Sequence, residues 1–529
     1  RIALKGMVFD NVFCGNSICA PSRATVLTGV HSHVNGLIDN RVEFDGSQPT
    51  FPKVLQRLGY GTALFGKWHL KSDPTGFDTW KVLPGQGSYY NPDFLTPDGR
   101  RRVEGHSTEV ITDAALAWLA DDRPADQPFL LMIQYKGPHR NWMPAPEHLG
   151  LYRDTDLPEP PTLFDDYEGR NPGAATQQME IDRHMSVPYD TKGPSDDDLF
   201  GGRTVRMNAA QRRAWQAAYG DENRAFAANP PTGDDLVRWK YQRYIKDYLR
   251  TVAGIDQQVG RVLDELDRLG LADDTIVVYS SDQGFFLGEH GWYDKRWMYE
   301  ESARMPFIIR WPGVIEPGSR SDALAQNIDF APTFIEAAGG EVPERVQGRS
   351  LLPLMRGEKG ARGERPEDIA GGWRDAVYYR YYEAAGPHNV PEHFGIRTDR
   401  YKLIRYPDLD AWELFDLERD PDELRSVHDD AAYAHVRARL ERRLRSLQAG
   451  DGDDPAWSSS VLQQRRLTKT AAAVRRRLAV DIDNALDLAS DAAPAAFDVV
   501  GRALRIEITG VTGDGDGVLL AHGGESFGY

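Results

Sequence analysis

Residues 19–29 read Cys-Ala-Pro-Ser-Arg-Ala-Thr-Val-Leu-Thr-Gly, and the rest of the chain is organised around this stretch. Pro21 suits a first helical position, because its missing N–H is one of the donors left free there. Apolar residues then recur at three-residue spacing, and Gly29 suits a helix end. The stretch therefore predicts a short helix with Cys19 just ahead of it and Arg23 one turn on. Free backbone N–H groups at such a place favour an anion or a sulfur nucleophile.

The composition narrows the class of protein. The chain has 529 residues, 40% of them hydrophobic and 10% aromatic, so a large globular core is expected. A formal charge of −17 excludes nucleic acid and anionic membrane surfaces as natural partners, and it also opposes an anionic substrate. No apolar run approaches the ~18 residues of a membrane span. Two cysteines give no disulfide framework and no indication of the redox compartment.

A pattern of helix, buried strand and polar tip occurs three times. Such alternation predicts an α/β fold with a large, mostly parallel sheet sandwiched by helices. Gly254 is expected to dent the last helix. The three units are a helix over 49–59 with a strand over 61–65 and the tip Gly66-Lys67-Trp68-His69, a helix over 107–120 with a strand over 129–135 and the tip Lys136-Gly137-Pro138-His139, and a helix over 236–270 with a strand over 275–281 and the tip Asp282-Gln283-Gly284.

The three tips point to one site. In sheets of this kind ligands bind beyond the carboxyl ends of the strands, so polar side chains at the tips are expected on a common rim. Those side chains are Lys67, His69, His139, Asp282 and Gln283.

The remaining segments predict the domain organisation. Residues 1–365 form the main domain, with a short helix at 3–6, a strand at 7–12 and later elements at 303–311 and 327–338. Within it, residues 140–235 are rich in Pro, Asp, Gly and Arg with weak periodicity, and they predict a long surface insertion near the mouth of the site.

The pattern of predicted secondary structure changes near residue 372. Short strands with tight turns and one closing helix predict a small antiparallel subdomain over 366–450. Residues 451–529 predict a helix at 470–490 and the opening of a β-sandwich-like extension, with strands at 503–509 and 518–521. A turn between those strands carries Asp514 and Asp516, which are better explained as a plain turn than as a calcium site.

The opening stretch resembles a known signature. Cys-x-Pro-Ser-Arg followed by Leu-Thr-Gly is similar to the signature of the type I sulfatases, in which the cysteine becomes formylglycine. The resemblance implies that Cys19 is converted by a formylglycine-generating enzyme, and that the hydrated aldehyde is the nucleophile. Two other interpretations of the stretch are a capped helix with a buried thiol and a Cys14–Cys19 disulfide.

Two further stretches carry the same resemblance, which covers residues 1 to about 450. The stretch Gly-Ile-Arg-Thr-Asp-Arg-Tyr-Lys-Leu-Ile from Gly395 looks like the C-terminal subdomain of these sulfatases. The stretch Ser-Asp-Gln-Gly-Phe-Phe-Leu-Gly-Glu-His-Gly-Trp-Tyr-Asp-Lys-Arg from Ser281 looks most like glycan sulfatases, including the N-acetylglucosamine-6-sulfatase group. Membership would imply an alkaline-phosphatase-like sheet architecture.

The resemblance also implies a role for each matching residue. Arg23 would hold the hydrate through its rigid fork of donors, and Lys67 would contact the hydrate and the sulfate oxygens. His69 would be the base of the elimination that releases sulfate. His139 and Lys295 would lie on the leaving side and neutralise the departing oxygen.

Asp282 and Gln283 resemble half of the family's metal site, which implies one Ca²⁺. Calcium takes ~6–8 oxygen ligands, and Gln supplies an oxygen where the family more often has Asn or His. The family's other two metal ligands are aspartates at the end of a preceding strand, and neither Asp10 nor Asp39 has that context. We therefore expect weak calcium binding and impaired arylsulfate turnover for the 529 residues alone, restored when such an N-terminal strand is added.

Four other residues are candidates for substrate contacts. His290 lies in Gly-Glu-His-Gly shortly after the metal tip, where a structural turn is the simpler interpretation. His388, Asn389 and His393 lie on a loop of the C-terminal subdomain that could reach the mouth of the site.

Three functions compete at this stage. The first is a sulfatase acting on a sulfated saccharide or an aryl sulfate. The second is a phosphonate monoester or phosphodiester hydrolase using the same formylglycine. The third is a non-catalytic protein that binds sulfated glycans. The sequence indicates neither the compartment nor the oligomeric state.

Overall fold

A computed structural model describes residues 1–357, 372–384 and 386–454. Its strands are β1 (Met7–Phe9), β2 (Val12–Phe13), β3 (Gly61–Lys67), β4 (Thr79–Leu83), β5 (Asp93–Thr96), β6 (Gly99–Arg102), β7 (Phe129–Gln134), β8 (Val277–Ser280), β9 (Phe286–Leu287), β10 (Tyr293–Asp294), β11 (Phe307–Arg310), β12 (Ser319–Ser321), β13 (Ala325–Gln326), β14 (Ala376–Tyr381), β15 (His393–Thr398), β16 (Tyr401–Tyr406) and β17 (Ala411–Asp416).

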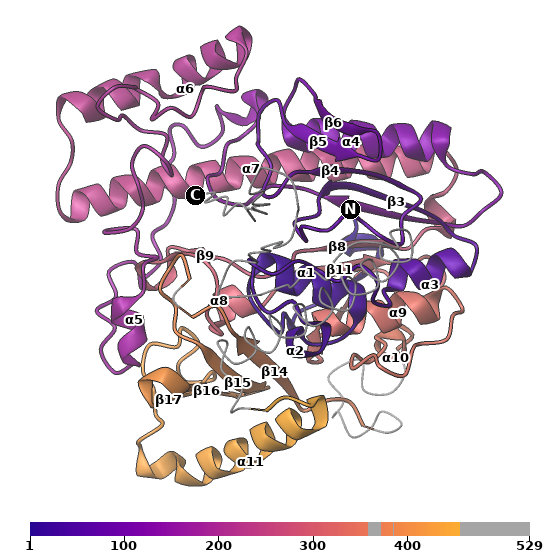
Figure 1. Cartoon of the computed structure of the whole chain (residues 1–529). Helices are drawn as coiled ribbons and strands as arrows, with labels where there is room; N and C mark the ends of the chain where they lie inside the picture. The colour runs from indigo at the N-terminus through magenta and orange to yellow at the C-terminus, as the bar shows by residue number, and fades with distance from the viewer. Residues whose placement is uncertain (358–371, 385, 455–529) are drawn as a thin grey trace, which may run out of the picture. The chain divides into compact units, whose positions relative to one another are not determined.

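Figure 1 labels many of these strands as well as the helices. They are α1 (Cys19–Thr28), α2 (Ser32–Asn35), α3 (Phe51–Arg57), α4 (Ser107–Ala117), α5 (Pro172–Thr176), α6 (Ala209–Ala228), α7 (Asp234–Arg268), α8 (Glu300–Ala303), α9 (Phe330–Ala337), α10 (Leu352–Met355) and α11 (Ala434–Asp451).

The first sheet has the order β6-β5-β4-β3-β7. Strand β3 is buried along its whole length and runs parallel to both β4 and β7. Successive side chains of a strand point to opposite faces. Accordingly, Leu64 packs into a core shared with α1, α3 and α9, whereas Ala63 and Phe65 pack on the other face against α4. A continuous apolar run therefore makes a strand covered by helices on both sides, as the sequence predicts.

Strand β8 belongs to a second sheet, of order β12-β1-β11-β8. It runs antiparallel to β11, which runs antiparallel to β1, whereas β1 and β12 are parallel. The α/β class and the parallel pairs are confirmed, and the antiparallel pairing of β8 is a feature that the sequence pattern does not predict. The β9–β10 ribbon and the short α8 connect β8 to β11, and antiparallel neighbours need no long helical crossover.

Helix α1 begins at Cys19 itself rather than after it. Ile18 is the extended residue before the helix, and its carbonyl accepts the Ser22 N–H at 3.0 Å. Pro21 is thus the third helical residue, which is tolerated because the first four N–H groups have no helical partner. Gly29 ends the helix in the left-handed region at φ 67°, and its N–H donates to the Thr25 carbonyl.

The insertion over 140–235 packs on the long helix α7, and it contains a helix that its weak periodicity does not predict. Helix α6 opens with a capping box in which Asn208 and Gln211 bond each other's backbone N–H groups. The Asn-x-x-Gln spacing is the one sequence signal for that helix. Helix α7 is a single helix over Asp234–Arg268 that includes Gly254, so the expected dent does not break it.

The C-terminal strands form an antiparallel sheet in chain order, β14-β15-β16-β17. Helix α11 packs on it through Val436, Leu440 and Leu444, which share a core with Ile396 and Leu403 (Figure 1). The small antiparallel sheet with one helix that the sequence predicts is confirmed.

The expected helix at 470–490, the strands at 503–509 and 518–521 and the Asp514/Asp516 turn lie outside the described residues. Among the helices that the structure describes, none combines the length and apolarity needed to cross a membrane.

Candidate active site

Arg23 is the residue that ties the predicted site together. From the second turn of α1, its Nε donates to Asp282 Oδ2 at 2.9 Å and its Nη1 donates to the Lys67 carbonyl at 2.7 Å. Nη1 also donates to Gln134 Oε1 at the end of β7. One guanidinium therefore joins α1 to the ends of β3 and β7 and to the residues after β8, although β7 and β8 lie in different sheets.

The start of α1 is fixed by neighbours on both sides. The Ala20 N–H donates to Asn40 Oδ1 at 3.1 Å, and Ser22 Oγ donates to the Asp282 carbonyl. Ser22 Oγ in turn accepts from Asn327 Nδ2 at 2.9 Å. Cys19 is 1% exposed as a residue, so the orientation of its thiol is set by packed surroundings rather than by solvent.

Cations surround Cys19. Four buried positive side chains interact electrostatically with it, and two of them, Lys136 and Arg296, are residues that the sequence analysis did not select. The four are Lys67, Lys136, Lys295 and Arg296. This local positive charge opposes the −17 of the whole chain, as an anion-binding site in an acidic protein requires.

Both predicted histidines are neutral. Burial lowers the pKa of His69 well below its ordinary value, and the nearby Lys67 and Arg23 cations lower it further. Burial and the Lys67 and Lys295 ammonium groups do the same to the pKa of His139. His139 Nδ1 lies 2.7 Å from the Arg140 carbonyl, which can only accept, so Nδ1 carries the proton and Nε2 has a free lone pair.

Lys295 remains an ammonium. Burial lowers its pKa, but the Asp294 carboxylate, whose Oδ1 lies 2.8 Å from Lys295 Nζ, produces a net upward shift. Asp294 Oδ2 also lies 2.8 Å from His388 Nε2 and 3.5 Å from Arg296 Nη1. The Asp-Lys-Arg stretch quoted for the family resemblance therefore forms a connected group with His388, which the structure brings to the site.

Lys136 responds to pH near neutrality. Burial and the neighbouring Lys67 lower its pKa to about 7. Its charge is present below that pH and is lost as the pH rises through it. We expect the inhibition constant of inorganic sulfate to increase about fivefold between pH 6 and pH 8.5, which corresponds to about 1 kcal/mol of charge interaction. A Lys136→Met variant should bind sulfate weakly at both pH values. If its inhibition constant still changed about fivefold between the two pH values, Lys136 would not be the group responsible.

The two predicted metal ligands offer oxygens but do not make a complete site. Gln283 Oε1 is buried and has no hydrogen-bond partner among the described residues, as expected for a ligand oxygen. Asp282 supplies a carboxylate that Arg23 already contacts. The described part of the chain contains no group of three or more His, Cys, Asp or Glu side chains arranged for a metal. The residues present therefore fit part of a calcium shell.

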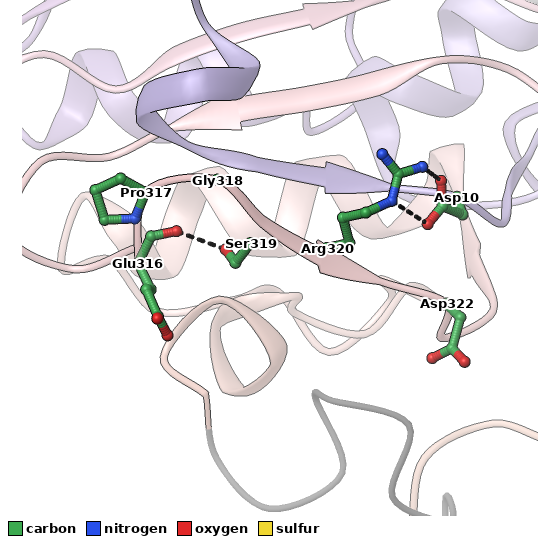
Figure 2. A pocket seen from close by; sticks show the side chains of 7 residues that line it. All are labelled: Asp10, Glu316, Pro317, Gly318, Ser319, Arg320 and Asp322. Atoms are coloured by element: carbon green, nitrogen blue, oxygen red, sulfur yellow. Dashed lines mark hydrogen bonds and ion pairs between the residues drawn. The ribbon is translucent and has the colours of Figure 1, made fainter.

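Asp10 and Asp39 are engaged elsewhere. Arg41 chelates Asp39 through Nε at 3.1 Å and Nη2 at 2.9 Å. Asp10 forms a bidentate ion pair with Arg320 in a surface pocket beside β1 and β12, shown in Figure 2. None of the residues lining that pocket is a predicted site residue.

Three of the weaker candidates are not brought to this cluster. His290 is fully buried, 3.2 Å from Asp165 Oδ2 and packed against the Trp292 ring. His393 lies inside the aromatic core between Trp297 and Tyr379, where burial lowers its pKa to about 4. Asn389 is exposed, and its Nδ2 donates to the Thr176 carbonyl at 2.9 Å. Cys14 and Cys19 are both free thiols.

Comparison with known proteins agrees with this geometry. The sulfatase family profile matches residues 1–340, and the profile of the N-sulphoglucosamine sulphohydrolase C-terminal region matches residues 288–450. The N-acetylglucosamine-6-O-sulfatase of Bacteroides thetaiotaomicron is 46% identical over 475 residues, which cover 87% of this chain and 83% of that protein.

Solved structures extend the comparison. A protein in complex with its substrate D-glucosamine-2-N,6-O-disulfate is 44% identical with a TM-score of 0.82, covering 86% of this chain and 92% of that one. The phosphonate monoester hydrolase of Silicibacter pomeroyi, at 22% identity and a TM-score of 0.59 over 85% of this chain and 89% of its own, shares the fold. Sulfatases generally use formylglycine and a metal ion. The chain therefore belongs to the sulfatase family, the hydrolases of sulfuric esters.

Proposed function

We propose that this sulfatase removes a sulfate monoester from a carbohydrate, of the glucosamine 6-sulfate kind, using formylglycine made from Cys19 by a formylglycine-generating enzyme. The observation that supports it most is the 46% identity to an N-acetylglucosamine-6-O-sulfatase over 87% of the chain. The 44% identical structure bound to a glucosamine disulfate supports the same class of substrate.

The sulfate group would lie above Cys19, among the cations that surround it. The hydrate of formylglycine supplies one hydroxyl as the nucleophile and a second hydroxyl whose deprotonation allows sulfate to leave. Arg23 and Lys67 would fix that group and the non-bridging sulfate oxygens. Lys67 is buried, the Arg23 side chain is 13% exposed, and both are held by hydrogen bonds or neighbouring charges. His69, kept neutral by burial beside Lys67, is suited to accept the proton from the second hydroxyl.

The leaving side would be served by His139 and Lys295. Lys295 stays positively charged beside Asp294 and can stabilise the departing oxygen directly. His139 is neutral, and its Nε2 has a free lone pair. An anionic ester placed between the two raises the pKa of the imidazole, so His139 gains a proton as substrate binds and can pass it to the sugar oxygen.

Asp282 and Gln283 would hold a Ca²⁺ ion together with further oxygen ligands. The ion would add positive charge beside the sulfate oxygens. His388, connected to Lys295 through Asp294, is the most suitable of the predicted substrate contacts. A sugar hydroxyl could bond the same carboxylate.

The test is a panel of 6-O-, 2-O- and N-sulfated glucosamines, 4-nitrophenyl sulfate, and a phosphodiester and a phosphonate monoester of 4-nitrophenol. The protein is produced with a formylglycine-generating enzyme and assayed with calcium, both as the 529 residues alone and with the expected N-terminal strand added; all variants are compared in the second form. We expect the highest kcat/KM for a 6-O-sulfated glucosamine. Higher kcat/KM for the phosphorus esters would favour a phosphonate monoester or phosphodiester hydrolase. The Cys19 peptide should be roughly 18 Da lighter than its cysteine form. An unmodified thiol together with tight glycan binding would favour a non-catalytic protein that binds sulfated glycans.

A further inference from the structure

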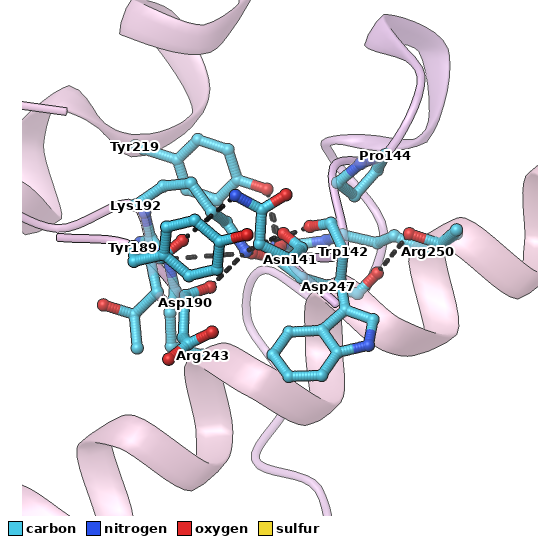
Figure 3. Close-up of polar contacts among 12 residues, drawn as sticks. Asn141, Trp142, Pro144, Tyr189, Asp190, Lys192, Tyr219, Arg243, Asp247 and Arg250 are labelled. Carbon is cyan, nitrogen blue, oxygen red and sulfur yellow. Dashed lines mark hydrogen bonds and ion pairs between the residues drawn. The ribbon is translucent and has the colours of Figure 1, made fainter. Parts of the chain in front are cut away.

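A buried polar cluster surrounds residues 141–142, shortly after His139 in the chain, where the insertion meets α7. Figure 3 shows Asn141, Trp142, Lys192 and Asp247 close together beside α7. At the centre is the ammonium of Lys192, whose side chain is 0% exposed. The active-site roles derived above do not use this cluster, so its purpose is open.

The ammonium of Lys192 has four oxygen neighbours. Its Nζ lies 2.6 Å from Asp247 Oδ2 and donates to the Asp190 carbonyl at 2.8 Å. It also donates to the Trp142 carbonyl at 3.0 Å and contacts the Asn141 carbonyl at 3.4 Å. A buried ammonium without partners is very costly, so this group strongly favours the one backbone arrangement that presents those carbonyls.

Asp247 is held on a rigid helix. Its Oδ1 accepts from Tyr219 Oη at 2.6 Å and from Arg250 Nη1 at 2.9 Å. The nearby Arg243 guanidinium, 4.0 Å from Asp247 Oδ2, is itself bonded to the Thr191 carbonyl at 3.0 Å. The Lys192–Asp247 pair is therefore anchored to α7 and not to a loop.

Further contacts link the backbone held by Lys192 to the side chain of His139. Arg140 makes a bidentate ion pair with Asp190, at 2.6 and 2.8 Å. The Arg140 carbonyl then accepts the Nδ1 proton of His139 at 2.7 Å, and the Trp142 N–H donates to the His139 carbonyl at 3.2 Å. The groups that orient the imidazole are thus the residues just before those that Lys192 holds.

We propose that Lys192, anchored by Asp247, is a positioning residue for the reaction: it fixes the 140–142 backbone and so aims His139 Nε2 at the leaving oxygen. This inference rests on the proposed role of His139 on the leaving side. A displacement of about 1 Å at a reacting group can cost about 100-fold in rate, so a distant buried lysine can control catalysis without touching substrate.

The experiment compares two sulfate esters that differ in their need for a proton. A glucosamine 6-sulfate has an alcohol leaving group that must be protonated, whereas 4-nitrophenolate leaves without a proton. The variants are Lys192→Met and the double variant K192M/D247N, which removes the buried negative charge that Lys192 balanced but keeps an amide oxygen to accept from Tyr219 Oη and Arg250 Nη1. We expect kcat for the sugar sulfate to fall about 10- to 100-fold, with KM within about twofold, and kcat for 4-nitrophenyl sulfate to fall less than about threefold.

Lys240→Met is the matched control. Lys240 is another buried lysine of the insertion interface, and its Nζ donates to the Asp182 carbonyl at 2.6 Å and the Ile181 carbonyl at 3.2 Å. That variant should leave the ratio of the two rates at the wild-type value, even if it lowers the melting temperature.

Equal losses on both substrates in the Lys192 variants, or the same change of ratio in Lys240→Met, would overturn the proposal. Wild-type protein with the expected N-terminal strand added that hydrolyses neither ester would instead contradict the proposed function, and the two failures are therefore distinct. Activities are normalised to the formylglycine content found by mass spectrometry and to the folded fraction by circular dichroism.

Discussion

Replacement of Cys19 by serine is expected to abolish steady-state turnover, by at least about 10⁴-fold, while the protein stays folded. A serine hydroxyl can attack sulfur but has no second hydroxyl through which to expel sulfate, so the enzyme should stop after one event. Cys19 lies at the start of α1, and a serine is tolerated at that helix end. The measurement is kcat together with the intact mass, which should rise by about 80 Da as a sulfate ester accumulates.

Cys14→Ser is the matched control. Cys14 is also fully buried, and burial raises the pKa of its thiol to about 12. Its Sγ lies 3.1 Å from Ser17 Oγ and 3.3 Å from the Ala303 carbonyl, so serine can keep both contacts. We expect activity within about twofold of wild type. A comparable loss in both variants would show that the site depends on packing around α1 and not on the chemistry of Cys19.

Replacement of Arg23 by methionine is expected to lower kcat/KM by at least about 10³-fold and to destabilise the fold by about 3 kcal/mol. The first effect follows from losing the guanidinium that we propose contacts the sulfate oxygens. The second follows because Asp282, 14% exposed at its side chain, loses the guanidinium that pairs with it at 2.9 Å. The measurements are kcat/KM and urea unfolding at several pH values.

The pH dependence of that destabilisation has a definite sign. Although burial raises the pKa of Asp282, the charges of Arg23 and Lys67 hold it below the ordinary value. Such a group contributes stability above its unfolded pKa, and the contribution is lost as the pH falls through the folded pKa. The deficit of Arg23→Met should therefore be largest near pH 7 and shrink as Asp282 becomes protonated in acid. Arg320→Met, which removes a surface pair with Asp10, should cost less than about 1 kcal/mol at any pH.

Much of the site could be predicted because its residues are marked by local patterns. The Cys-x-Pro-Ser-Arg stretch marks a helix start, Lys67 ends an apolar strand, and His139 and Asp282 each come shortly after one. The polar residues at the strand ends were predicted to lie together because their strands would be parallel neighbours in one sheet. In the structure they lie together although the strands belong to two sheets. Arg23 bridges to Asp282 even though β8 pairs antiparallel in a second sheet. The site roles of these residues stay predictions until the variants are measured.

Other features have no local signal. His290 and His393 look like the site histidines in sequence, but they pack among aromatic rings because distant strands and loops close over them. Lys136 looks like any lysine at a strand end until burial beside Lys67 lowers its pKa to about 7. The Lys192–Asp247 pair joins residues 55 positions apart through one buried 2.6 Å contact.

The sequence by itself determined the family, the α/β class and the small C-terminal sheet, and it supplied the residues that we propose carry the chemistry. Helix starts, apolar strands and short motifs depend on neighbours along the chain, and the sequence shows those neighbours directly. Only the tertiary structure decided which cations surround Cys19, which histidines are core residues and which buried lysine holds the backbone beside His139. Charge interactions and desolvation depend on neighbours in space, and those neighbours come from elements far apart in the chain.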